Sequence, residues 1–184
     1  MVRSHEEAVV SDMVEKWGRP VAERGFAQVP NYLLLLNQFL DEEHRLSPVE
    51  MLVLVQLVGT WWKKDDRPFP SMATLARRCG SSERQIQRAV NQLVAVGLIA
   101  REKRRAGRGL ISSNAYDLTP LTEVLEEAAK AYPNDYPRKV DRHLAGRITA
   151  RLGKKVSADE QAPQSEVKEQ PKPVRRRPRL TVPA

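Results

Sequence analysis

The sequence predicts a mainly helical fold with one small β-hairpin, and three of its features indicate this. Residues 71–96 hold two short amphipathic stretches with helix caps, joined by a glycine-containing turn of three residues. Two candidate strands follow directly, separated by a loop of arginine and glycine. Apolar residues at helical spacing lie before and after this region. We expect one folded domain of the 184 residues, with additional segments at both ends.

The positive charge is concentrated in two blocks of the chain. The formal net charge is +8, from 31 Lys and Arg against 23 Asp and Glu. Residues 67–109 alone hold 10 basic and 2 acidic side chains, and residues 132–184 hold 13 and 6. The remaining segments are acidic. This pattern indicates a surface that binds a polyanion, most often nucleic acid, although a solvated basic face has the same composition.

Composition also disfavours several classes of protein. The single cysteine, Cys79, cannot form a disulfide within its own chain, which favours a reducing compartment. The apolar runs are too short to span a bilayer, and the acidic residues 1–7 are unlike a signal peptide. We therefore expect a cytoplasmic protein that does not bind membranes.

The sequence shows no pattern typical of an active site. The three histidines, His5, His44 and His143, lie in separate segments without partners at metal-ligand spacing. Cys79 fits a packed position between helices better than the role of a nucleophile. No catalytic carboxylate pair stands out. We expect neither an enzyme nor a bound metal, cofactor or small-molecule ligand.

The N-terminal third predicts three helices. Ser4 and Glu7 form a capping box for an amphipathic helix within residues 1–19. An extended piece at 26–30 and an apolar helix at 32–40 follow. Ser47, Pro48 and Glu50 combine an N-cap, a proline at the first helical position and a second capping box. The helix that they begin, through about Thr60, is apolar all round, which predicts a central core helix.

The two capped helices of the basic block form the central pattern. Ser71 precedes a helix at 72–79, and Gly80 stands where that helix must end. Ser82 then caps a second helix at 83–96. Two helices joined by a three-residue turn with glycine have the geometry of a helix-turn-helix.

The second helix has an outward face suited to reading DNA bases. If Ile86, Val90 and Leu93 point inward, the opposite face carries arginine and amide side chains. These residue types form bidentate hydrogen bonds with guanine and adenine in the major groove, whereas the alternative is an ordinary surface. The candidate base contacts are Glu83, Arg84, Gln85, Gln87, Arg88 and Asn91.

Two further groups of residues are candidates for contacts with the phosphate backbone of DNA. The hydroxyl residues at the helix starts either contact phosphates or serve only as caps, and they are Ser71, Thr74, Ser81 and Ser82. The predicted hairpin has strands at 98–103 and 110–118, and its basic loop forms a wing that lies along the phosphates or enters the minor groove. Its candidate contacts are Arg101, Lys103, Arg104, Arg105 and Arg108.

The last segment predicts one more core helix and a basic tail. Thr119 and Pro120 begin a periodic helix that ends near Tyr132, which places the folded domain at residues 20–132. Residues 133–184 form a basic, largely disordered tail with a short helix at 139–152. The apolar stripes at 9–17 and 121–132 are candidate contacts of a homodimer, or they pack onto the domain's own core.

Several stretches together resemble a known family. From Phe26 to about Leu121 the chain is similar to the winged helix-turn-helix proteins of bacterial mobile elements, which include DNA-binding domains of plasmid and phage replication initiators and related regulators. The matching stretches are Gly25-Phe26, Val29-Pro30-Asn31, Ser47-Pro48-Val49-Glu50, Pro68-Phe69-Pro70-Ser71, Thr74-Leu75-Ala76, Arg84-Gln85-Ile86-Gln87-Arg88, Gly97-Leu98-Ile99 and Ser113-Asn114-Ala115-Tyr116-Asp117-Leu118. The resemblance implies a winged fold and DNA binding in a bacterial cytoplasm, at the nucleoid when bound.

The sequence thus predicts a protein that binds specific double-stranded DNA with the helix 83–96 in the major groove and the wing 101–109 on the backbone. Transcriptional regulation is the first choice of process, and recognition of a plasmid or phage replication origin is the alternative. An adaptor that uses the same fold to bind protein or RNA is an alternative of another class.

Overall fold

The computed structural model of the chain describes residues 12–105, 111–134 and 142–155. The described part is mainly helical with one antiparallel hairpin, as the sequence predicts. Residues 12–17 are helical. The elements that follow are α2 (Arg19–Ala22), α3 (Asn31–Leu34), α4 (Leu36–Phe39), α5 (Pro48–Val58), α6 (Met72–Cys79), α7 (Glu83–Ala95), β1 (Ala100–Arg105), β2 (Ile111–Asp117), α8 (Thr119–Ala131) and α9 (Arg142–Thr149).

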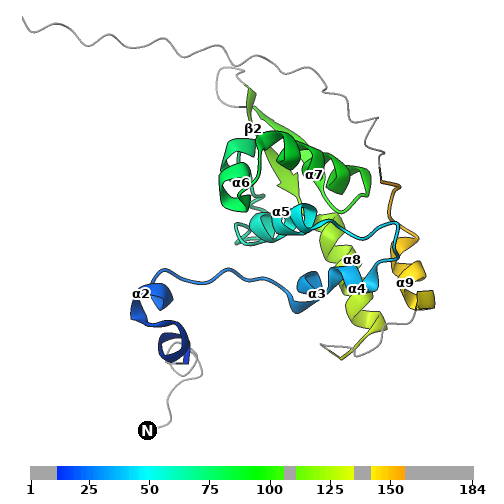
Figure 1. The fold of residues 1–184 in the computed structure, drawn as a ribbon, viewed down its shortest axis with the longest axis horizontal. Coiled ribbons are helices and arrows are strands. Elements are labelled where there is room, and N and C mark those ends of the chain that lie inside the picture. The colour runs from blue at the N-terminus through cyan, green and yellow to red at the C-terminus, as the bar shows by residue number, and fades with distance from the viewer. Residues whose placement is uncertain (1–11, 106–110, 135–141, 156–184) are drawn as a thin grey trace, which may run out of the picture.

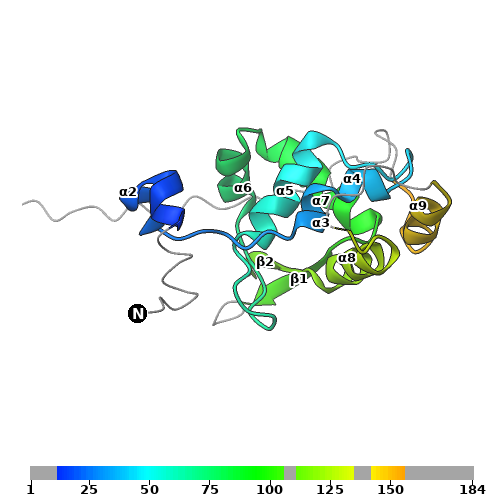
Figure 2. The same ribbon diagram turned by 90° about the horizontal axis from the view of Figure 1, so that it is seen from below.

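The elements form one body and a separate N-terminal arm. Helices α5, α6 and α7 pack together, and the hairpin lies along one side of them (Figures 1 and 2). Helix α6 lies at one end of the body and α9 at the other, in both views. The helical residues 12–22, which we call the arm, stand away from the body at the end of an extended segment. The capping box expected at Ser4 and Glu7 lies outside the described residues.

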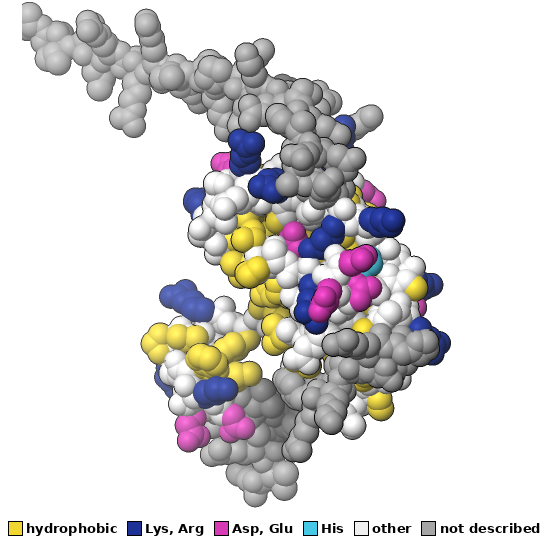
Figure 3. Space-filling model, turned by 45° about the vertical axis from the view of Figure 1, so that its right-hand side comes forward, with side chains coloured by type: hydrophobic (Ala, Val, Ile, Leu, Met, Phe, Trp, Pro, Cys, Tyr) yellow, Lys and Arg dark blue, Asp and Glu magenta, His cyan; other side chains and the backbone are white. Residues whose placement is uncertain are grey.

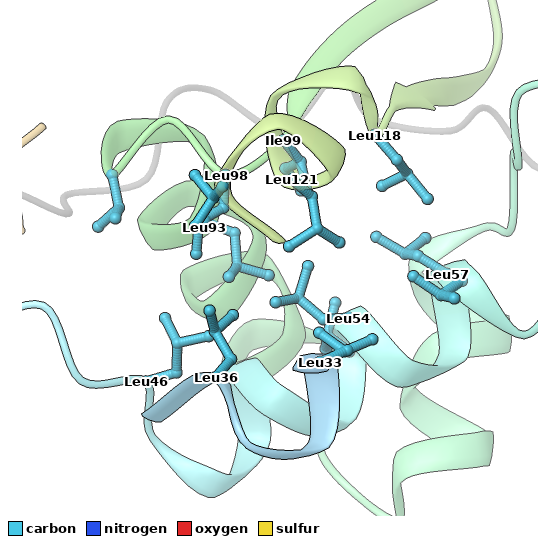
Figure 4. Close-up of a cluster of buried hydrophobic side chains, with 14 of the residues drawn as sticks. Leu33, Leu36, Leu46, Leu54, Leu57, Leu93, Leu98, Ile99, Leu118 and Leu121 are labelled. Atoms are coloured by element: carbon cyan, nitrogen blue, oxygen red, sulfur yellow. The ribbon is translucent and has the colours of Figure 1, made fainter. Parts of the chain in front are cut away.

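The central helix α5 begins as its sequence predicts. The Glu50 N–H donates to Ser47 Oγ at 3.3 Å, and the Ser47 N–H donates to the Glu50 carboxylate at 2.8 Å, so the capping box is complete. Val53, Leu54 and Leu57 are fully buried, and Leu54 and Leu57 point into the cluster of core side chains (Figure 4). Because a helix that is apolar all round cannot bury every side, Leu52 stays 37% exposed.

The apolar stretch 32–40 is two short helices and not the single helix expected from its composition. The backbone leaves the helical region at Leu35, between α3 and α4. This break brings the rings of Tyr32 and Phe39 to 5.6 Å, and Phe39 stacks in turn on Tyr132 at 5.2 Å. In a continuous helix, residues seven apart are separated by about 10 Å along the axis, which is too far for stacking. The aromatic stack therefore accounts for the interruption.

Strand β1 begins two residues later than the sequence predicts. Helix α7 ends in a Schellman motif, in which Gly97 adopts φ 78°. The N–H of Gly97 donates to Val94 O and that of Leu98 to Leu93 O, both at 3.0 Å. Leu98 and Ile99 are consequently buried under the end of α7 and do not pair with β2.

The packed part of the chain continues beyond Tyr132, where the sequence predicts its end. Helix α9 lies within the stretch 139–152 expected to be helical, and it packs on α4 and α8. Its Ala145 and Ile148 are buried, and Ile148 belongs to the same core cluster as the side chains of α5 and α7. The predicted disorder of residues 156–184 concerns residues outside the described part and stays a prediction.

The residues after α9, 150–155, form a segment that begins as a turn and that we call the strap. The Gly153 N–H donates to the carbonyl of Val96 at 3.0 Å. The Lys155 ammonium lies 3.2 Å from the Glu50 carboxylate and also donates to the carbonyl of Arg45. The strap thus joins the end of α7 to the start of α5, although the sequence assigns this segment to the tail.

The stripe on α8 belongs to the core. Leu121, Val124, Ala128 and Tyr132 are buried in the same cluster as the side chains of α5 and α7. This decides between the two roles that the sequence leaves open for residues 121–132, because a buried stripe is not available to a second copy. Within the described residues no helix has the length and apolarity needed to cross a membrane.

Candidate nucleic-acid interface

Helices α6 and α7 are fixed by local contacts that the sequence predicts. The Ser71 Oγ accepts from the Thr74 N–H at 3.1 Å and begins α6. Gly80 ends that helix with φ 61°, a left-handed conformation in which L side chains are strained. Ser82 and Gln85 form a complete capping box at the start of α7. The turn therefore has the three residues 80–82, as expected.

The inner face of α7 is buried against α5 and α6. Ile86, Val90 and Leu93 are fully buried, and they meet Leu75 and Ala76 of α6 in the same cluster. The small Ala76 lets the two helices approach closely at the turn. These contacts set the rotation of α7 and so determine which of its side chains point outward.

The outer face of the first two turns of α7 is open. Glu83, Arg84, Gln85 and Arg88 are all exposed, and the two arginines lie one helical turn apart. Guanidinium groups so placed have the reach and the donor geometry for guanine edges. Gln87 and Asn91 flank this row and are half-buried.

Two of the predicted amide contacts already have partners within the helix. The Gln87 Nε2 donates to the Asn91 Oδ1 at 2.8 Å, so the two amides form a pair one turn apart. The Gln85 Oε1 accepts from the Ser82 N–H at 3.1 Å as part of the capping box. A base contact by Gln85 would therefore use only its amino group, whereas the Gln87–Asn91 pair keeps one acceptor and one donor together.

The outward face is shorter than helical periodicity alone indicates. Ala95 lies on the same side as Arg84 and Arg88 by angle, yet it is half-buried. The strap covers it, because Gly153 packs so tightly here that an added Cβ would stand 2.3 Å from the Ala95 carbonyl oxygen. The strap therefore limits the outward face to the residues before Ala95, and the exposed Arg84 and Arg88 lie in the N-terminal half, which is the half that helix-turn-helix proteins use.

The hydroxyl residues act as caps in the structure. Ser71 and Ser82 accept hydrogen bonds from the backbone of their own helices, and Ser81 Oγ donates to Gln85 Oε1 at 3.3 Å. Thr74 Oγ1 lies 2.9 Å from Ser71 Oγ. These bonds account for the four residues at the helix starts without excluding phosphate contact by the two exposed ones, Ser71 and Ser82.

Sequence reasoning missed two basic residues on α6. Arg77 and Arg78 are exposed in its last turn. Arg78 lies four residues after Thr74 and lines the same hollow of about 220 Å³ between α6 and the preceding loop. Helical spacing from Thr74 could have identified Arg78, because residues four apart share a face.

The wing has one basic face and one acidic face. Arg101 lies opposite Tyr116 in the register, and Lys103 lies opposite Asn114. Because opposed residues share a face and successive residues alternate, Glu102 points to the other side of the hairpin. Arg104 and Arg105 are the last two residues of β1, and their side chains lie outside the described part of the structure. Arg108 lies outside the described residues.

Arg67 of the α5–α6 loop contacts the acidic face of the wing. It forms ion pairs with both Glu102 on β1 and Asp117 on β2, and no sequence pattern indicates these two pairs. Hydrogen bonds from the side chain and the N–H of Thr119 hold the pKa of Asp117 below its ordinary value of 3.8, and the charge of Arg67 adds to this. Asp117 is therefore ionised at neutral pH and provides the start of α8 with an acceptor.

The basic face of the wing meets the core at its base. Burial raises the pKa of Tyr116 to about 12, and the positive charge of Arg101 opposes this shift. The phenol of Tyr116 therefore stays neutral at neutral pH. Arg101 is exposed, so a cation stands at the rim of the core where the hairpin leaves it.

The remaining candidates for chemistry are packed or isolated. Cys79 is half-buried against the core, and burial raises the pKa of its thiol. His44 pairs with Asp41 at 2.6 Å. Among the residues that the structure describes, no group of His, Cys, Asp and Glu side chains could hold a metal ion.

Comparison with known proteins agrees with this geometry. Residues 44–99 match the family model described as a helix-turn-helix domain, and this range covers α5, α6, α7 and the turn between them. No curated protein matches the chain. Residues 44–99 thus form a helix-turn-helix domain, a class of domain of which many members bind DNA, and the hairpin that follows makes the fold a winged helix-turn-helix.

Proposed function

We propose that this protein is a transcriptional regulator that recognises a specific sequence of double-stranded DNA. One observation carries the proposal: Arg84 and Arg88 extend from the open face of a helix whose opposite face is fully buried against α5 and α6. Such a helix presents fixed donors at the depth of the major groove, where guanine offers two acceptors. The alternative of a protein-binding adaptor does not require two arginines at this spacing.

We assign the other candidate residues either to contacts with bases or to contacts with phosphates. The paired amides of Gln87 and Asn91 extend the row of base contacts. Arg77 and Arg78 on α6, and Arg101 and Lys103 on the wing, flank α7 with cations that fix its register on the backbone. The tail 156–184 adds attraction that does not depend on sequence and that salt weakens.

Binding fragments of genomic DNA and sequencing those retained tests this proposal directly. The parent protein should enrich one sequence, and the double variant Arg84→Ala/Arg88→Ala should lose the preference while keeping weak, salt-sensitive binding. The matched control is Arg24→Ala/Lys130→Ala, which removes the same charge from exposed sites far from α7 along the chain. Equal preference in the parent and the Arg84/Arg88 variant would mean that α7 does not read bases.

The location of the enriched sites distinguishes the two processes. Single or paired sites beside promoters support regulation. An array of repeated sites at a replication origin supports the initiator instead. Absence of any binding to duplex DNA, with capture of RNA or protein, would support the adaptor.

We propose further that the protein binds as a homodimer through its arm. Trp17, Val21 and Phe26 are exposed. The ring centroids of Trp17 and Phe26 lie 6.5 Å apart, and the two ring planes are inclined by 53°. Hydrophobic side chains gather on the arm and on the side of the body that faces it (Figure 3). A second copy would cover these surfaces and double the number of base contacts, which a single short helix needs for useful affinity.

A further inference from the structure

Arg67 links both strands of the wing from outside the hairpin. Its Nη2 lies 3.1 Å from the Asp117 carboxylate on β2, and its Nη1 donates to the Glu102 carboxylate on β1. Ala100 lies opposite Asp117 and Glu102 lies opposite Ala115, so the two carboxylates are diagonal neighbours on one face. A single guanidinium therefore holds both strands at the base of the wing.

The loop that carries Arg67 is attached to the wing at a second point. The Tyr116 N–H on β2 donates to the carbonyl of Pro68 at 2.9 Å. The same loop reaches α6, because Phe69, Thr74 and Arg78 line one hollow. The loop is thus a second connection between the wing and the helix-turn-helix, beside the direct passage of α7 into β1 through the buried Leu98 and Ile99.

The ion pairs of Arg67 are poorly suited to stabilising the fold. Its side chain is 41% exposed and that of Glu102 is 52% exposed, and surface pairs of this kind contribute little to stability. A guanidinium held by two carboxylates does define an orientation, because its donors form a planar fork. These ion pairs are therefore better explained as contacts that set the orientation of the wing than as contacts that stabilise the fold.

We propose that Arg67 is a positioning residue for DNA binding. It holds the wing so that the face with Arg101 and Lys103 reaches the phosphates of the duplex that α7 reads, and it neutralises the carboxylates of Glu102 and Asp117, which would repel the same phosphates. The inference rests on the proposed function, and it assigns no contact between Arg67 and DNA.

The dependence of DNA affinity on salt separates positioning from direct contact. Each phosphate contact adds about 0.9 to the slope of log affinity against log salt. Arg67→Gln should flatten the slope by more than the value of one contact, because several cations of the wing lose their phosphates together. The control Arg24→Gln removes the same charge elsewhere. A decrease of this slope by the value of one phosphate contact or less would overturn the proposal.

A second background tests whether the carboxylates carry the effect. Glu102→Gln/Asp117→Asn leaves Arg67 without an anionic partner on the wing while keeping an acceptor oxygen at 117 for Thr119. In this background Arg67→Gln should cause no further loss of affinity. A loss as large as in the parent would show that Arg67 acts without Glu102 and Asp117, and would refute the positioning role.

Limited trypsin digestion gives a readout that needs no DNA. In the free protein, Arg67→Gln should accelerate cleavage within β1 at Arg101 and Lys103, while the thermal midpoint stays near that of the parent. Unchanged cleavage contradicts the inference. If the parent protein binds no duplex DNA, the proposed function fails. If the parent binds DNA and the Arg67→Gln variant has the same affinity and the same salt dependence, only the inference about Arg67 is refuted.

Discussion

The backbone of Gly153 is hydrogen-bonded to the carbonyl of Val96, at 3.0 Å, and this bond joins the strap to the end of the α7 helix. The contact leaves no room for a side chain, since a Cβ at 153 would lie 2.3 Å from the Ala95 carbonyl oxygen. A segment that the sequence assigns to a basic tail is therefore part of the support of α7.

Gly153→Ala should destabilise the protein because the added methyl group displaces the strap. Overpacking of this kind costs about 1–3 kcal/mol in the free energy of unfolding, which chemical denaturation measures. Gly146→Ala is the matched control, because a Cβ at this position of α9 meets nothing within 4 Å. That variant should be more stable than the parent by up to about 1 kcal/mol, since alanine favours helix. Equal effects of the two substitutions would contradict the assigned role of Gly153.

Gln87→Ala should reduce sequence discrimination more than stability. The Gln87–Asn91 pair contributes about 0.2–0.5 kcal/mol to the helix, so the thermal midpoint should change little. If the pair reads a base, affinity for the selected site should fall about tenfold or more, with no loss on a scrambled site. Gel shifts on both duplexes provide the measurement. Asn91→Ala should behave alike, and a loss of equal size on both duplexes would assign the pair to nonspecific binding.

The ionisation of Asp117 should make stability depend on pH in the acid range. Its pKa is lowered in the folded state, so the stabilisation is present at neutral pH and is lost as pH falls below about 4. A carboxylate at the start of a helix contributes about 0.3–1 kcal/mol. The thermal midpoint of the parent should exceed that of Asp117→Asn at pH 7, and the difference should shrink toward pH 3. If the difference in thermal midpoint between the parent and Asp117→Asn is constant from pH 7 to pH 3, the negative charge of Asp117 is not the source of the stabilisation.

Truncation after Lys155 should weaken DNA binding on all sequences alike. Residues 156–184 carry six basic side chains, so their removal should flatten the salt dependence of affinity. The free energy of unfolding should remain near that of the full chain because the strap is retained. Truncation after Tyr132 also removes α9 and the strap, and it should lower stability as well as affinity. A selective loss on one DNA site in the shorter deletion would indicate that the tail reads sequence.

Trp17→Ser/Val21→Ser should convert a dimer into a monomer. Both side chains are about half exposed on the arm, so the substitution removes apolar surface without opening the core of the body. Sedimentation velocity at several concentrations measures the change. Glu23→Ser/Arg24→Ser, at two exposed residues directly after the arm, serves as the control. A parent protein that is monomeric with and without its DNA site would exclude this use of the arm.

Much of the helix-turn-helix follows from the sequence because its signals are local. The caps at Ser47, Ser71 and Ser82 bond to backbone groups three residues away, and Gly80 and Gly97 stand where a left-handed residue is needed. The rotation of α7 follows from its own periodicity. Such features depend on neighbours within one or two turns, which the order of residues specifies directly.

Other features required the tertiary structure, because their partners are distant in the chain. The break at Leu35 depends on a stack that includes Tyr132, and the shortened outer face of α7 depends on Gly153. The attachment of the acidic face of the wing depends on Arg67, which lies 35 and 50 residues before its two carboxylates.

The amino-acid sequence by itself determined the capped helices, the turn between them and the row of arginine and amide side chains on α7. The tertiary structure alone decided how much of that row stays exposed, how the wing is held and that the packed part of the chain continues past Tyr132 to the strap. The physical reason is that hydrogen bonds along a helix form between near neighbours, whereas burial and ion pairing depend on which distant segments the fold brings together.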